Sequence, residues 1–96
     1  MKKQSTKTSN PDIRIVILQR GWVVVGHYSQ VGEECLIEHA RVVRRWGTSQ
    51  GLGELAAGGP IEGKTILDPV MTVRFHPLTV IATIDCEASK WAALVR

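Results

Sequence analysis

The chain has 96 residues and 44% apolar composition, which is typical of one small globular domain and excludes both a second domain and disorder of the whole chain. Its formal net charge of +3 comes from Lys2, Lys3 and Lys7, because residues 11–96 hold nine basic and nine acidic residues. A duplex-DNA-binding domain usually carries its basic excess on the folded surface that meets phosphate, so this charge layout argues against that class.

Residues 1–11 differ in composition from the rest of the chain. They are polar, rich in Ser, Thr and Lys, and end at Pro11, so they are predicted to form a flexible basic arm. Residues 12–96 are predicted to form a single β-rich domain. No apolar signal segment follows the arm, and apolar runs such as 23–25 are too short to span a bilayer. A cytoplasmic protein with reduced thiols and no membrane partner is the resulting prediction.

The first part of the domain is predicted to be a β-hairpin. Residues 13–18 are rich in β-branched side chains and are typical of a strand. Residues 19–21 are predicted to form a tight turn and residues 22–28 the return strand. Within that strand Gly26 indicates a bulge or a close approach of backbone. A second turn is predicted at 29–32.

Residues 33–46 fit two secondary structures. In favour of a helix, Leu36, Ala40 and Val43 are spaced as one helical face, acids come early, arginines come late, and a glycine follows. In favour of a strand, the apolar run 35–37 follows a glycine turn. The residues alone leave both alternatives open.

The rest of the chain completes a small, mainly β fold. The predicted elements are a Gly-rich connection over 47–63 with a helical turn at 52–57, a second loop over 61–69 with short extended pieces, strands at 70–75 and 79–86, and a short helix over 87–96 whose Trp91, Leu94 and Val95 face inward. The predicted architecture is a small SH3-like barrel or a curved antiparallel sheet of four to six strands, with a short crossover helix and a short C-terminal helix.

Four stretches carry a resemblance: the hairpin ending in Val25-Gly26, Leu36 to Trp46, Gly51 to Ala56, and Val80 to Cys86. In them the chain resembles small proteins of unknown function from tailed phages and prophages, over about three quarters of its length. The resemblance implies that residues 35–46 form a strand that leads to an aromatic residue and is followed by a short helix. It also implies the host cytoplasm as the location. That group has no established activity, so no catalytic residue is carried over.

The chain shows no pattern that identifies an enzyme. Cys35 and His39 are the only closely spaced pair of metal-ligand residues, and a zinc site needs more such pairs. No nucleophile elbow or Cys/His signature is present. The chain is therefore predicted to be a non-enzymatic protein without metal or cofactor.

The strongest candidate site is an Arg-Arg-Trp-Gly junction. Arginine suits phosphate, tryptophan offers a stacking surface, and the glycine-rich stretch 47–53 supplies backbone N–H groups for an anion. This stretch does not match the Walker or dinucleotide-binding patterns. The predicted ligand-binding residues are Arg44, Arg45, Trp46, Thr48, Gly51, Gly53 and Lys64. The alternative is that Trp46 lies in the core, the arginines are solvated edge residues, and the loop is a turn-rich connection.

Three functions follow as hypotheses. The first is an oligomeric binding protein of phage type that holds a small anionic, nucleotide-like ligand at this junction and sequesters a host defence signal. The second is a nucleic-acid-binding accessory protein that uses the lysine arm and the aromatic-basic strand. The third is a protein–protein interaction module that caps a host or phage complex through an exposed sheet edge.

Overall fold

The computed structural model describes residues 13–96, so the predicted arm over residues 1–11 lies outside the described part of the chain. The elements, in chain order, are β1 (Ile13–Leu18), the 3₁₀ turn η1 (Gln19–Gly21), β2 (Trp22–Val31), β3 (Glu34–Arg45), α1 (Leu52–Gly58), β4 (Ile66–Leu67), β5 (Met71–Phe75), the 3₁₀ turn η2 (Pro77–Thr79), β6 (Val80–Asp85) and α2 (Ala88–Trp91). The first hairpin, the crossover helix and the two late strands are thus confirmed.

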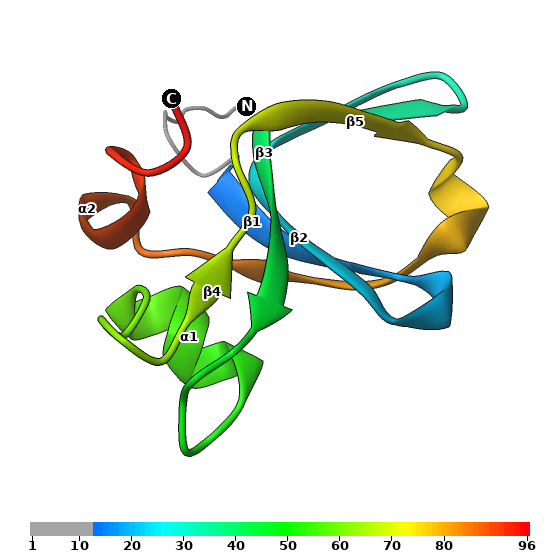
Figure 1. The fold of residues 1–96 in the computed structure, drawn as a ribbon. Coiled ribbons are helices and arrows are strands. Elements are labelled where there is room, and N and C mark those ends of the chain that lie inside the picture. Colours follow the sequence, from blue (N-terminus) through cyan, green and yellow to red (C-terminus); the bar gives the residue numbers. More distant parts are fainter. Residues whose placement is uncertain (1–12) are drawn as a thin grey trace.

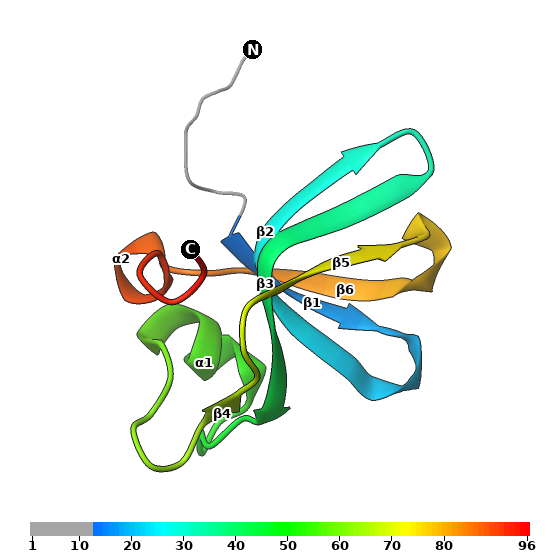
Figure 2. The same ribbon diagram turned by 45° about the horizontal axis from the view of Figure 1, so that its top comes forward.

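The strands form one curved antiparallel sheet. Its order is β4-β3-β2-β1-β6, and β5 pairs with β3. No ladder joins β5 to β6 within residues 13–96, so the sheet is open and the second of the two predicted architectures is the observed one. Figure 1 shows α1 and α2 together at one end of the molecule. Figure 2 shows the turns that follow β1, β2 and β5 fanning out at the other end.

β1 and residues 23–26 of β2 lie at the centre of the sheet and are covered on both faces. Neighbouring residues of a strand point to opposite faces, so Ile15 and Val25 face one way, and Val16 and Val24 the other. The helix-side core comprises Ile13, Ile15, Val23, Val25, Val43, Leu55, Ala56, Trp91 and Val95. The strand-side core comprises Val16, Leu18, Val24, Ile37 and Ala40, with Val73, Phe75 and Val80 packed against it. The apolar run in β2 reflects this two-sided burial.

Residues 34–45 form one long strand, which agrees with the strand alternative. β3 pairs with β2 along one side, with β5 near its start and with β4 near its end. Its registers shift between Ile37 and Ala40, and His39 has a φ of 53°. This bulge puts Ile37 and Ala40, three residues apart, into the same core. The helical pattern of Leu36, Ala40 and Val43 does not form one face, because Ala40 lies in the strand-side core and Val43 in the helix-side core.

Gly26 lies opposite this bulge, and the prediction of a close approach is confirmed. The β2–β3 register shifts between Val25 and His27. A Cβ atom on Gly26 would lie 2.6 Å from Cγ2 of Ile37 and 3.0 Å from the Cα atom of Ala40. Only glycine lets the two backbones come this close, so Gly26 allows the bend in the sheet.

Two predicted boundaries were wrong. The turn predicted at 29–32 is shorter, because the ladder continues to the pair Val31–Glu34 and only Gly32 and Glu33 remain between the strands. The helix predicted over 87–96 is limited to α2. Trp91 and Val95 are nonetheless fully buried, as expected. Among residues 13–96, neither helix has the length and apolar character needed to cross a membrane.

Candidate functional site

The predicted junction lies where β3 leaves the sheet. Arg44 and Arg45 are its last residues and are exposed. Trp46 follows and is 43% exposed, so it is not a core residue. A Cβ atom on Gly51 would lie 4.0 Å from the Trp46 ring. The structure thus brings Trp46 and Gly51 together at the surface.

The loop after Trp46 packs closely on the second loop. A Cβ atom on Gly47, whose φ is 77°, would lie 2.6 Å from the carbonyl carbon of Lys64. The Thr65 hydroxyl donates to the Trp46 carbonyl oxygen at 2.7 Å and accepts from the Ile61 N–H at 2.8 Å. Lys64 therefore adjoins the junction through its backbone, and the two loops support one another.

Polar groups of the glycine-rich loop already have partners within the loop and helix. The Thr48 hydroxyl donates to the Gly51 carbonyl oxygen at 2.7 Å. The N–H of Gln50 donates to Oε1 of Glu54 at 2.8 Å. Gly53 lies within the first turn of α1. A carboxylate of the protein thus occupies an N–H group that an anionic ligand would need, and the loop forms a braced connection.

A different surface has the shape of a binding groove. Two adjoining hollows lie between the β1–β2 turn and β5, and both are lined by Arg20 and Trp22. The first, of about 450 Å³, is also lined by Val42, Arg44, Asp68 and Met71. The second, of about 360 Å³, is also lined by Leu18, Val73, Arg74 and Phe75. We call the two hollows together the Trp22 groove.

Strand geometry explains why Trp22 and Arg44 meet. Val24 faces Val42 across the β2–β3 ladder. Because side chains alternate with a period of two, Trp22 and Arg44 come to the same face at the same end of the two strands. This face continues the strand-side core to the surface, where Trp22 is 53% exposed.

Positive charge predominates in the Trp22 groove. Arginines 20, 44 and 74 line it, against a single aspartate, Asp68. Nε of Arg44 lies 2.7 Å from Oδ1 of Asp68. Asp68 is itself held in place, because Nε of Arg41 donates to its backbone carbonyl oxygen at 2.7 Å. Nη1 of Arg74 lies 3.4 Å from a carboxylate oxygen of Glu34.

Of the seven predicted site residues, only Arg44 lines the Trp22 groove. Arg20 and Trp22 were predicted to be a turn residue and a strand residue, with no binding role. The sequence signal that could have indicated this site is Arg20-Gly21-Trp22, in which an arginine and a tryptophan flank the glycine of a hairpin turn. Their meeting with β5 depends on the curvature of the sheet, which local sequence does not encode.

The cysteines and histidines offer little further chemistry. Burial raises the pKa of the Cys86 thiol to about 12, so this thiol stays protonated at neutral pH. The hydroxyl of Tyr28 lies 3.5 Å from the sulfur of Cys35, and this hydrogen bond raises the pKa of Tyr28. Within residues 13–96 no group of three His, Cys, Asp or Glu side chains is arranged to hold a metal ion.

A comparison of the chain with protein-family models, curated proteins and solved structures found no match. The resemblance to phage proteins stays a prediction.

Proposed function

We propose that this protein binds single-stranded nucleic acid in the Trp22 groove, without catalysing a reaction. The observation that carries the proposal is the position of Trp22: a half-exposed indole between two hollows that are lined by three arginines. Proteins that bind single strands combine such aromatic stacking platforms with a positively charged groove that follows the backbone.

The two parts of the groove match the two parts of a nucleotide. The Trp22 ring offers a stacking face to any base, and guanidinium groups hold phosphates through paired N–H donors. Because Arg20 and Trp22 line both hollows, the hollows adjoin, and an extended chain can occupy both where a compact ligand would occupy one. A single-stranded ligand also fits the nearly neutral domain, since stacking provides binding energy that does not depend on charge.

Backbone strain at Arg20 supports a binding role. Arg20 has a φ of 67°, in the left-handed region that costs a non-glycine residue roughly 1–2 kcal/mol. Such conformations cluster at functional sites, where the surrounding structure holds them. Here the conformation belongs to the turn that brings Arg20 to the groove beside Trp22.

The first prediction concerns Trp22. Replacing one stacking ring should weaken binding by about 1–3 kcal/mol, or about 5- to 150-fold. Trp22→Ala should therefore raise the Kd for a labelled oligothymidylate of about 15 nucleotides by this factor in fluorescence anisotropy. If all three arginines contact phosphate, log K of the wild type should fall against log salt with a slope of about −2.

Trp46→Ala is the matched control, because both tryptophans are about half exposed but only Trp22 lines the groove. Trp46→Ala should leave the Kd unchanged. Wild-type protein that binds neither single-stranded DNA nor RNA at low salt would refute the proposal. If Trp22→Ala and Trp46→Ala lost affinity equally, the Trp22 groove would be refuted as the binding site. Binding of ATP or GTP that requires Trp46 and is independent of Trp22 would favour the nucleotide-like ligand at the junction instead.

A further inference from the structure

We propose that the free edge of β6 is a self-association surface, on which β6 of a second copy pairs in antiparallel orientation about an axis at Ala82. β6 pairs with β1 along one side. Within the described part of the chain no strand pairs with its other side. This leaves backbone N–H and C=O groups that a strand of another molecule can bind. The proposal is independent of the proposed nucleic-acid binding.

The middle of β6 is open to solvent on both faces. Ile81, Ala82 and Thr83 are consecutive and all exposed, and Ile81 is 64% exposed. In a half-buried strand every second residue would be covered. Ile81 is the extra residue of the bulge, and its neighbours Ala82 and Thr83, which point to opposite faces, are both exposed, so a second strand has room to approach this part of β6.

β6 has one of the features that usually protect an edge strand, a bulge at Ile81, where its register with β1 shifts between Ile17 and Leu18, but it lacks the others. Natural edges carry lysines, prolines or inward-pointing charges, or are very short. β4 has only two residues, and β5 carries Arg74. By contrast, residues 77–84 carry no charge, and the only proline among them, Pro77, precedes the strand. β6 is therefore the edge best suited to pairing.

The sequence of β6 fits a second copy of itself. In an antiparallel pair centred on Ala82, Val80 faces Ile84 and Ile81 faces Thr83, so each pair joins two β-branched side chains, which favours pairing. The carboxylate of Asp85 would face Thr79 of the other copy rather than a like charge. Within its own chain Asp85 lies 3.8 Å from Nε of Arg14. Charge therefore does not oppose this two-fold arrangement.

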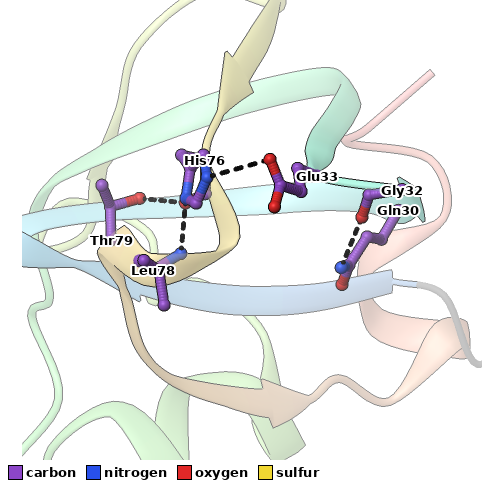
Figure 3. A network of polar contacts seen from close by, with 6 residues as sticks. All are labelled: Gln30, Gly32, Glu33, His76, Leu78 and Thr79. Atoms are coloured by element: carbon purple, nitrogen blue, oxygen red, sulfur yellow. Dashed lines mark hydrogen bonds and ion pairs between the residues drawn. The ribbon is translucent and has the colours of Figure 1, made fainter.

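The turn before β6 is held in a fixed shape (Figure 3). Nδ1 of His76 accepts from the Leu78 N–H at 3.1 Å, and the Thr79 hydroxyl donates to the His76 carbonyl oxygen at 2.6 Å. Nε2 of His76 lies 3.8 Å from the Glu33 carboxylate on the neighbouring hairpin. A strand that starts from a braced turn loses little freedom when it pairs.

The test is the concentration dependence of mass, measured by sedimentation equilibrium on the full chain. The wild type should form dimers. Ala82→Lys would set two lysines directly opposite each other and should raise the dimer Kd at least about tenfold, because like charges that face each other across an interface cost several kcal/mol. Val31→Lys is the matched control, since Val31 is 83% exposed and lies at the end of β2. This variant should dimerise like the wild type.

Cross-linking tests the register. An Ala82→Cys variant places two cysteines opposite each other, where Cα atoms of antiparallel pairs are about 4.5–5.5 Å apart and a disulfide can form. Oxidation should link this variant, but not the wild type or Val31→Cys, into dimers. A monomer at all concentrations, or dimers that persist in Ala82→Lys, would overturn the proposal. Equal cross-linking of Val31→Cys and Ala82→Cys would overturn it as well.

Discussion

Gly26 is the residue on which the bend of the sheet depends most directly. Its missing side chain allows the β2 backbone to approach Ile37 and the backbone of Ala40. The bulge at His39 takes up the extra residue on the facing strand. Gly26 and the bulge together allow β3 to bend, so that it pairs with β5 near its start and with β4 near its end.

Gly26→Ala should lower the free energy of unfolding by about 1–3 kcal/mol, because overpacking of this size forces backbone to shift. Urea denaturation followed by circular dichroism measures the change. Gly53→Ala is the control, since no atom lies within 4 Å of a Cβ atom there and Gly53 is in a helix. It should raise stability by about 0.4–1 kcal/mol. A Gly26→Ala variant as stable as the wild type would contradict the close-packing argument.

The two short helices form a unit through one carbonyl group. The indole Nε1 of Trp91, which is fully buried, donates to the Ala56 carbonyl oxygen at 3.1 Å. The N–H of Glu87 donates to the same oxygen at 3.0 Å. Helices of seven and four residues are too short to be stable alone, so their stability comes from this docking and from the sheet beneath.

Trp91→Phe should therefore cost about 0.5–1.5 kcal/mol for the lost hydrogen bond, in addition to a cavity term. Trp91→Ala should cost about 3–5 kcal/mol. Thermal unfolding followed by far-ultraviolet circular dichroism reports both values. If Trp91→Ala destabilised the protein no more than Trp46→Ala, the helices would not depend on Trp91.

In the whole molecule the two cores share the strands β1 and β2. Helix-side residues such as Ile15 alternate with strand-side residues such as Val16 on one strand. Neither core can lose its packing while the other keeps its strands in place. The domain should therefore unfold as one cooperative unit.

Leu55→Ala tests this coupling, because Leu55 belongs to α1 and the helix-side core. It should cost about 2–5 kcal/mol. Cys35 is buried in β3. Its sulfur is hydrogen-bonded to the hydroxyl of Tyr28, which packs against the strand-side core. The urea midpoint for labelling of the Cys35 thiol, in a Cys86→Ser background, should shift together with the midpoint from circular dichroism. Separate midpoints would show that the two cores unfold independently.

Most elements could be predicted from local sequence, and the candidate site could not. The β-branched runs at 13–18 and 79–86 and the turn residues between strands specify extended structure locally. Residues 33–46 stayed open because β3 is buried on both faces and carries a bulge, so its apolar residues do not alternate regularly along the sequence. Arg44 was predicted as a site residue, but its partner Asp68 is 24 positions further along the chain. Such a pair forms only when β3 and the segment after β4 are packed together.

The amino-acid sequence alone determined the mainly β class, the hairpin of β1 and β2, and the glycine required at position 26, because side-chain alternation and backbone freedom act over a few residues. The tertiary structure decided where Trp22 and the arginines meet, that β1 and β2 contribute side chains to both cores, and which strand is left as a free edge. These features depend on curvature and on the order of strands. Both arise from packing between segments that are distant in the sequence, so no local sequence pattern could predict them.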